Sequence, residues 1–219
     1  MKAVEVSTWC VRLDVSPETI AGFYATLSRD ERDRSARFRF ARDRERFIAA
    51  RGALRARLGR HVGTRPGAIR FAYNAFGKPA LAPEFGGRLK FNLSHSGDRA
   101  LLAITTDAEI GVDLEHIRPD VDYGEIARSV FPAAEVDQLD GVPAHLYPLA
   151  FLRCWTRKEA YLKADGEGLA DLDVTPTDAI NFEPAVGYVG AVAVQGRAVQ
   201  ASFMLPSSDR HQGGATFSA

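Results

Sequence analysis

Two acidic side chains close an apolar segment of this chain. Residues 110–115 read IGVDLE. Side chains alternate along a β-strand, so Asp113 and Glu115 share one face while Val112 and Leu114 bury the other. Two acids on one strand face most often belong only to the solvent-exposed face of a sheet. Here, however, they end a segment that looks buried, and grouped carboxylates suit Mg²⁺, which also takes phosphate oxygens and water. The pattern predicts a magnesium site that a further acid completes.

A helical segment supplies that acid. Residues 155–163 read WTRKEAYLK, in which Trp155, Glu159 and Lys163 recur every four residues and therefore line one helical face. An exposed Glu–Lys pair would stabilise the helix by only ~0.2–0.5 kcal/mol. The tryptophan on the same stripe indicates a face that is partly buried. Glu159 is therefore a candidate metal ligand or general base, and Lys163 is a candidate for stabilising negative charge in a transition state.

Two further segments carry groups that suit phosphate. Residues 91–97 read FNLSHSG, and we expect Ser94 and His95 to lie in a donor-rich loop after a strand, although a single histidine there is more often structural. Lys78 lies in a second loop, residues 74–79, which reads NAFGKP. The chain has no GxxxxGK[ST] loop and no GxGxxG turn after a strand, which argues against P-loop and Rossmann nucleotide sites.

The charges of the chain are unevenly distributed. The 28 basic and 28 acidic residues cancel, and this balance excludes a general polyanion-binding coat. Residues 1–70 nevertheless carry a net +8 and residues 71–219 a net −8. Twelve arginines fall within residues 29–60, where apolar positions at helical spacing would turn Arg46, Arg51, Arg55 and Arg57 largely away from the core. Singly these arginines suit a solvated helix face, but as a group they predict an anionic ligand or partner.

The segments that position these residues mix strands and helices. Ser16-Pro17-Glu18 predicts a helix start, and the spacing of Ser28 and Glu31 predicts a second start with a capping box. We expect one helix over residues 16–27 and another that begins at 28 and runs into the arginine-rich stretch, with helical spacing from Phe47 to Gly59. Further helices are expected over 122–131, 133–140 and 145–164. We expect strands over 3–13, 69–73, 100–105, 110–115, 180–182, 188–194 and 198–204. One more strand is expected to end at residue 93, and a last one to run from residue 214 to the C-terminus. The chain is therefore α+β, and its halves hint at a duplication.

Neither a membrane segment nor a disulfide framework is expected. No apolar run approaches the ~20 residues of a membrane span, and the first ten residues lack the apolar region of a secretory signal. Cys10 and Cys154 alone offer neither a set of disulfides nor metal-ligand spacing. We therefore expect a cytoplasmic protein.

Taken in order, the motifs resemble the signature blocks of the Sfp-type 4′-phosphopantetheinyl transferases. The blocks are GKP at 77–79, FNLSHS at 91–96, IGVDLE at 110–115, WTRKEAYLK at 155–163 and GEGL at 166–169. The resemblance implies an α+β pseudo-dimer of two similar halves, residues 1–106 and 107–219, with coenzyme A between them. It also implies transfer of the 4′-phosphopantetheine arm to a serine of an apo acyl, aryl or peptidyl carrier protein, releasing adenosine 3′,5′-bisphosphate.

The same resemblance implies roles for individual residues. The residues whose family counterparts hold Mg²⁺, or Mn²⁺, are Asp113, Glu115 and Glu159. Glu159 also matches the base for the serine, although a bound cation depresses its basicity, so a water on the cation is an open alternative. The residues that match coenzyme A contacts are Lys163 at the pyrophosphate, Ser94 and His95 at phosphate and adenosine, Lys78 of the GKP block, and Arg46 at the 3′-phosphate or adenine.

One departure from the family pattern concerns the 3′-phosphate. Glu31 occupies a position where the family has a basic residue. Which of Arg29, Arg32 and Arg34 contacts the 3′-phosphate therefore stays open.

The resemblance also bears on the partners, and two other functions remain as alternatives. We expect a monomer that binds neither nucleic acid nor membrane and serves polyketide, nonribosomal peptide or siderophore assembly. One alternative is a magnesium-dependent coenzyme A phosphodiesterase that needs no carrier. The other is a non-enzymatic nucleotide or nucleic-acid binding module built on the arginine-rich helices.

Overall fold

Two copies of one strand-and-helix arrangement make up most of the chain. The computed structural model describes residues 3–106, 108–166, 173–174, 176–203 and 216–218. The first copy comprises β1 (Val4–Arg12), α1 (Pro17–Thr26), α2 (Arg29–Ser35), α3 (Ala41–Val62), β4 (Leu89–Ser96) and β5 (Arg99–Thr106). The second comprises β6 (Ile110–His116), α4 (Tyr123–Val130), α5 (Ala133–Asp140), α6 (Tyr147–Asp165), β7 (Ala179–Phe182) and β8 (Tyr188–Val194).

The strand orders of the two copies correspond. β1-β5-β4 and β6-β8-β7 are both antiparallel, with three helices between the first strand and the next strand of each sheet. A short hairpin of β2 (Phe71–Tyr73) and β3 (Pro79–Leu81) is added only in the first copy. This correspondence confirms the α+β pseudo-dimer.

The last strands of the chain join the sheet of the first copy. β9 (Val199–Phe203) pairs in parallel with β1, and β10 (Thr216–Ser218) pairs antiparallel with β9, which gives the order β10-β9-β1-β5-β4. The two halves therefore share a sheet. A division between residues 106 and 107 remains our proposal for the two halves, and β9 and β10 cross it.

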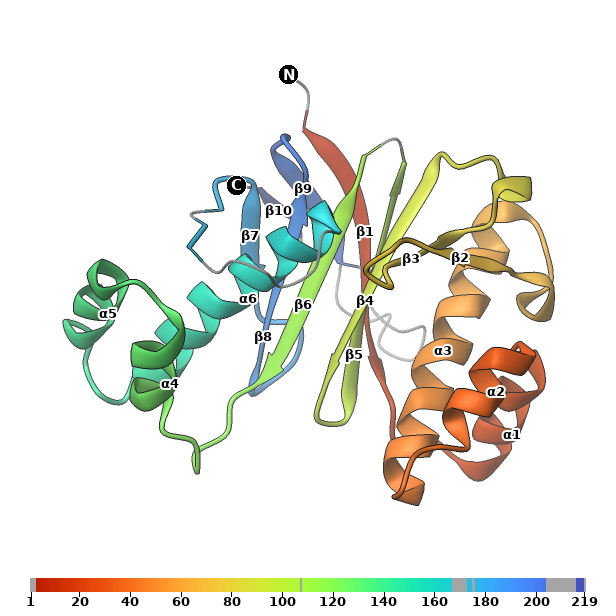
Figure 1. Ribbon diagram of the computed structural model, residues 1–219, viewed down its shortest axis with the longest axis horizontal. Coiled ribbons are helices and arrows are strands. Elements are labelled where there is room, and N and C mark those ends of the chain that lie inside the picture. Colours follow the sequence, from red (N-terminus) through yellow and green to blue (C-terminus); the bar gives the residue numbers. More distant parts are fainter. Residues whose placement is uncertain (1–2, 107, 167–172, 175, 204–215, 219) are drawn as a thin grey trace.

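Helices cover the outer faces of the two sheets (Figure 1). Leu54 and Leu58 of α3 are fully buried in one cluster with Leu102 of β5. On the inner faces, Leu101 of β5 packs in a second cluster with Val112 of β6. The layers therefore run α3, first sheet, second sheet, α6.

The packing of α6 explains the glycine of the IGVDLE motif. A Cβ at Gly111 would lie 2.0 Å from the carbonyl oxygen of Ala160, so the backbone of α6 rests directly on β6. This close approach places the inner face of α6 beside the carboxylates that follow Gly111.

The helix starts predicted at Ser16 and Ser28 are confirmed, whereas the arginine-rich stretch is divided between α2, which ends at Ser35, and α3, which begins at Ala41. Ser16 caps α1 by accepting a hydrogen bond from the Thr19 N–H, and Glu31 accepts one from the Ser28 N–H at the start of α2. α3 passes Gly59 and ends at Gly63, whose φ of +70° suits the left-handed helix cap. Among the described residues, no helix has both the length and the apolar character needed to cross a bilayer.

Candidate active site

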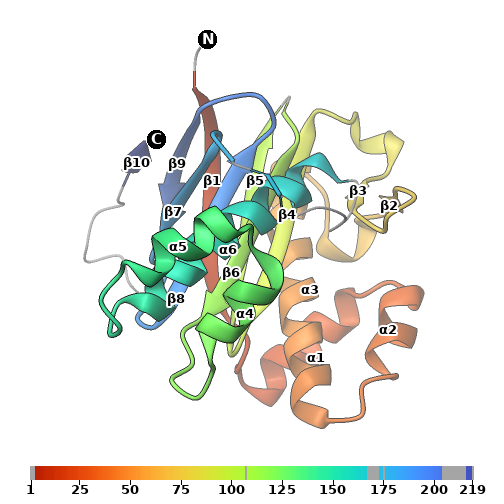
Figure 2. The same cartoon turned by 60° about the vertical axis from the view of Figure 1, so that its left-hand side comes forward.

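Polar side chains connect the two halves where β4 lies beside β6 (Figure 2). The Ser94 hydroxyl donates to Asp113 Oδ1 at 2.9 Å. Two residues further along, the Ser96 hydroxyl donates to Glu115 Oε2 at 2.9 Å and accepts from the His116 N–H at 3.1 Å. Side chains alternate along both strands, so Ser94 and Ser96 of one half face Asp113 and Glu115 of the other and donate hydrogen bonds to them.

The predicted Ser-His-Ser loop is wrong, because these residues belong to a strand. β4 continues to Ser96, which pairs with Arg99 of β5 across the turn that contains Gly97. As a result, Asn92, Ser94 and Ser96 face β6, and the amide oxygen of Asn92 accepts from a β6 backbone N–H at 3.0 Å. Sequence reasoning missed Asn92 and Ser96, although the alternation of a longer strand would have found them.

Lys163 of α6 lies at the centre of the predicted chemical groups. Its Nζ is 2.5 Å from Asp113 Oδ1, 3.6 Å from Glu159 Oε2 and 3.4 Å from Ser94 Oγ. Asp113 and Glu159 are only 3% and 5% exposed. The structure thus brings Ser94, Asp113, Glu159 and Lys163 into one cluster, with Glu115 on the same face of β6 as Asp113.

The electrostatics of this cluster favour a further cation. Burial raises the pKa of Glu159, with the charge of Lys163 lowering it and that of Asp113 raising it further. Burial and the charge of Asp113 likewise raise the pKa of Glu115, against the Ser96 hydrogen bond and Lys163. Asp113 Oδ2 is buried, and no residue that the structure describes forms a hydrogen bond with it. Negative charge is therefore crowded here, with one carboxylate oxygen left unused.

A divalent ion fits these donors chemically. No three His, Cys, Asp or Glu side chains of the described residues are arranged as a metal-binding group, and Lys163 Nζ lies against the carboxylates. The available donors are nevertheless all hard oxygens, the kind that Mg²⁺ takes. Asp113, Glu115 and Glu159 are the side chains that could hold such an ion.

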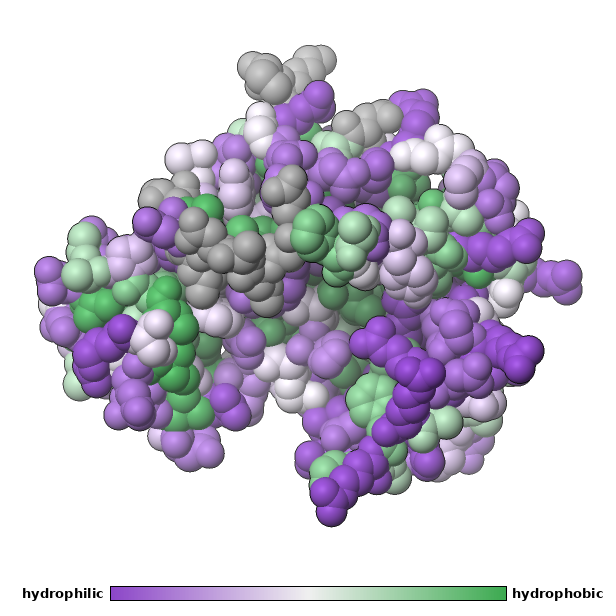
Figure 3. Space-filling model, viewed as in Figure 1, coloured by the Kyte–Doolittle hydropathy of each residue, from purple (hydrophilic) through white to green (hydrophobic). Residues whose placement is uncertain are grey.

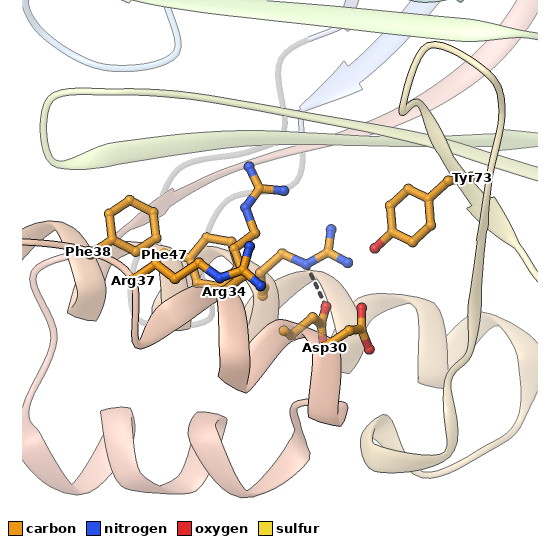
Figure 4. A pocket seen from close by; sticks show the side chains of 8 residues that line it. Asp30, Arg34, Arg37, Phe38, Phe47 and Tyr73 are labelled. Atoms are coloured by element: carbon orange, nitrogen blue, oxygen red, sulfur yellow. Dashed lines mark hydrogen bonds and ion pairs between the residues drawn. The ribbon is translucent and has the colours of Figure 1, made fainter.

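An arginine-rich pocket of about 620 Å³ lies between α2, α3 and β2. Figure 4 shows Arg34 and Arg37 extending into it and the Tyr73 hydroxyl pointing toward them. The residues that line it are Asp30, Glu31, Arg34, Arg37, Phe38, Phe47, Arg51 and Tyr73. Two or more guanidinium groups around one hollow are typical of an anion-binding site.

His95 connects this pocket electrostatically with the carboxylate cluster. His95 is an exposed residue, and partial desolvation of its imidazole lowers its pKa, which the positive charges of Lys163 and Arg34 lower further. The positive charges of α6 and α2 therefore both act on His95 of β4 and favour its neutral form. The surface is hollowed between the lobe of α4 and α5 and the lobe of α1 and α2 (Figure 3).

Arg46 lies outside the arginine-rich pocket. Its guanidinium makes two hydrogen bonds to Asp14, Nε at 2.8 Å and the terminal nitrogen at 2.9 Å. This bidentate pair lowers the pKa of Asp14 and raises that of Arg46. Of the three arginines left open by the sequence, Arg34 lines the pocket, whereas Arg32 donates to the backbone carbonyl of Ala25.

Lys78 caps the carboxyl end of α6. Its Nζ donates to the Ala164 carbonyl at 2.8 Å and lies 3.0 Å from Glu109 Oε2. Cations and hydrogen-bond donors are favourable at this end of a helix. Lys78 also lines, together with Lys163 and Phe76, a small pocket at the edge of the carboxylate cluster.

The prediction that Arg51 and Arg55 turn away from the core is wrong. Arg51 is 9% exposed and Arg55 is fully buried. The helical pattern placed them beside the apolar stripe of α3, but Glu31 of α2 lies over that position and pairs with both. A buried acid from another helix makes these arginines part of the interior.

Comparisons with known proteins cover nearly the whole chain. Residues 14–107 match the family model described as 4′-phosphopantetheinyl transferase, N-terminal, and residues 109–204 match the 4′-phosphopantetheinyl transferase superfamily. The chain is 39% identical over 216 residues to the 4′-phosphopantetheinyl transferase HetI of Nostoc, covering 91% of each chain. It is 41% identical to AcpT of Escherichia coli, covering 56% of this chain and 58% of AcpT. Identity to psf-1 of Bacillus pumilus is 34%, covering 66% of this chain and 60% of psf-1.

Proposed function

This chain belongs to the 4′-phosphopantetheinyl transferase superfamily, and we propose that its active site is the cluster formed by β4, β6 and α6. Enzymes of this family transfer the 4′-phosphopantetheine arm of coenzyme A to an apo carrier protein, and so does this one. The observation that carries the assignment is the convergence of Asp113, Glu159 and Lys163 around the Ser94 hydroxyl.

The reaction joins the serine oxygen of the carrier to the β-phosphorus of coenzyme A. The bond from that phosphorus to the bridging oxygen breaks, adenosine 3′,5′-bisphosphate leaves, and the serine proton must be taken up. Glu159 is the proposed acceptor: burial raises the pKa of its carboxyl group and favours proton uptake, whereas a bound cation would lower that pKa, so Glu159 can act as the base only while it is not a tight ligand of the cation. The Lys163 ammonium stabilises the negative charge that builds on the leaving phosphate oxygens.

Asp113, Glu115 and Glu159 are proposed to hold Mg²⁺. The ion, when bound, neutralises charge on the pyrophosphate. Two features support this role: Asp113 Oδ2 is buried with no hydrogen-bond partner among the described residues, and the pKa values of Glu115 and Glu159 are raised. A bound cation would contact the oxygen and lower both pKa values. Ser94 and Ser96 orient two of these carboxylates through their hydrogen bonds.

The pocket of Arg34, Arg37 and Tyr73 is proposed to receive the adenosine end of coenzyme A, with the 3′-phosphate on the guanidinium groups. Lys163 would continue the positive charge toward the pyrophosphate, and the imidazole of His95, whose pKa is lowered, would act as a neutral hydrogen-bonding group. Arg46 is the weaker candidate for the 3′-phosphate, because Asp14 already occupies its guanidinium. Lys78 is proposed to act at the edge of the site, where it fixes the end of α6.

We propose a cytoplasmic monomer that binds no nucleic acid and modifies carriers of polyketide, nonribosomal peptide or siderophore assembly.

Incubation with coenzyme A, Mg²⁺ and an apo carrier, followed by mass spectrometry of the carrier, tests the function. A carrier heavier by one phosphopantetheine arm is expected. Release of bisphosphate without any carrier would instead indicate a coenzyme A phosphodiesterase.

A further inference from the structure

We propose that Glu31 is a positioning residue for nucleotide binding: its carboxylate links the three elements that line the arginine-rich pocket, α2, α3 and β2. The inference rests on the proposed function, which places the 3′-phosphate of coenzyme A in that pocket. Glu31 itself is 2% exposed and is one of the residues that line the pocket.

The Glu31 carboxylate receives hydrogen bonds from two helices. Oε1 accepts from Arg51 Nε at 2.6 Å, and Oε2 accepts from Arg55 Nε at 2.7 Å, both on α3. Oε2 also accepts from the N–H and the hydroxyl of Ser28, at 3.0 Å each. The dashed line in Figure 4 is the ion pair with Arg51. One side chain thereby fixes the start of α2 and its position on α3.

The third element of the pocket, β2, contacts the same network through Phe71. The guanidinium carbons of Arg51 and Arg55 lie 4.5 Å and 5.2 Å from the centre of the Phe71 ring. Arg55 also donates to the backbone carbonyls of Pro66 and Ile69, just before β2. Tyr73, two residues after Phe71, faces the same side of the strand and lines the pocket.

Arg34 depends on Glu31 through the geometry of α2. Residues three apart on a helix are neighbours on one face, so Arg34 lies beside Glu31 on the face that meets α3. A shift of α2 on α3 would therefore carry Arg34 out of register with Arg51 and Tyr73. Arg34 is a residue that we assign to the 3′-phosphate, so the shift would weaken that contact above all.

The charge balance of the network also points to an anion in the pocket. Two buried guanidinium groups share one carboxylate, and within the described ranges one terminal nitrogen of each has no hydrogen-bond partner. Burial raises the pKa of Glu31, but Arg51, the Ser28 N–H and Arg55 together lower it below its ordinary value, so the carboxylate is ionised at neutral pH. A net positive charge remains beneath the pocket, which a phosphate would balance.

The test compares the binding of coenzyme A and dephospho-coenzyme A by calorimetry, without carrier, in the wild type and Glu31→Gln. The substitution preserves size but removes the charge that holds both arginines. We expect the Kd of coenzyme A to rise five- to tenfold and that of dephospho-coenzyme A by less than twofold. With carrier present, kcat at saturating coenzyme A should stay within twofold. Circular dichroism establishes that the variant is folded.

Glu84→Gln is the matched control, because Glu84 forms an exposed pair with Arg70 in the same half of the chain. It should leave both Kd values unchanged. Glu31→Asp keeps the charge on a shorter arm and should show the same preference for weakening coenzyme A, by two- to threefold; it carries the test if Glu31→Gln does not fold.

Equal losses for both ligands would overturn the inference, because they would indicate general destabilisation. Unchanged coenzyme A binding in folded Glu31 variants would overturn the inference as well. The proposed function would stand in that case, provided that the wild type transfers the arm. A wild type that does not bind coenzyme A would instead refute the proposed function, and the inference with it.

Discussion

The Ser94 hydroxyl donates a 2.9 Å hydrogen bond to Asp113 Oδ1 across the junction of the two halves. Ser94 belongs to β4 of the first half and Asp113 to β6 of the second. The hydroxyl and Lys163 both engage Oδ1, and the second oxygen of the carboxylate has no hydrogen-bond partner in the part of the chain that the structure describes. The orientation of the proposed metal ligand therefore depends on docking of the two halves.

Replacing Asp113 or Glu159 should abolish transfer. Asp113→Asn and Glu159→Gln remove charges proposed to hold the cation, and loss of such electrostatic stabilisation costs about 10²-fold or more in rate. The measurement is kcat/KM for carrier modification, with circular dichroism to establish folding. Asp120→Asn, at an exposed position of the same half, is the control. A folded Asp113→Asn variant with full activity would contradict the proposed metal site.

Ser96→Ala should weaken the dependence on Mg²⁺ without removing catalysis. The variant loses the donor that orients Glu115, and loss of such a partner typically costs about tenfold in metal affinity. We expect the Mg²⁺ concentration for half-maximal activity to rise by that factor, with kcat at saturating Mg²⁺ near the wild-type value. Ser129→Ala changes a hydroxyl that bonds only within α4 and should have no effect. An unchanged Mg²⁺ requirement in Ser96→Ala would contradict a role for Glu115.

Arg34 and Arg46 make opposite predictions for coenzyme A and dephospho-coenzyme A. Arg34→Ala should weaken coenzyme A binding about tenfold, as expected for loss of a charged contact worth roughly 1.5 kcal/mol, and leave dephospho-coenzyme A nearly unaffected. Arg46→Ala breaks only the pair with Asp14 and should affect both ligands alike. A larger loss for coenzyme A in Arg46→Ala than in Arg34→Ala would favour the assignment made from the sequence.

The contribution of Glu31 to stability should depend on pH. Its pKa is lower in the folded state than its ordinary value of 4.5, so its contribution is complete above that value and is lost as the pH falls through the folded-state pKa. Glu31→Gln should lower the free energy of unfolding by about 3–5 kcal/mol at pH 7, because two buried guanidinium groups lose their counterion. Urea unfolding at several pH values should show the gap to the wild type narrowing below about pH 4.5. A gap that is constant down to pH 3 would contradict the ion-pair network.

Local signals predicted most of the fold. The Ser16 cap, the spacing of Ser28 and Glu31 and the glycine after Asp165 each act within a few residues, and the structure confirms the helices that they delimit. Alternation likewise placed Asp113 and Glu115 on one face, and the four-residue spacing placed Glu159 and Lys163 together.

Contacts between distant segments could not be read from these patterns. Arg55 lies 24 residues from Glu31, and nothing in the spacing of α3 shows that an acid of α2 covers it. The pairing of β9 with β1 spans nearly the whole chain. Asp14 engages Arg46 because the end of β1 meets α3, which only the assembled first half establishes.

The most direct test of the central claim is the mass of an apo carrier protein after incubation with coenzyme A, Mg²⁺ and this enzyme, in the wild type and in Asp113→Asn. The wild type should add one phosphopantetheine arm to the carrier serine, and Asp113→Asn should add none in the same time. No mass gain with the wild type on several different apo carriers would contradict that claim.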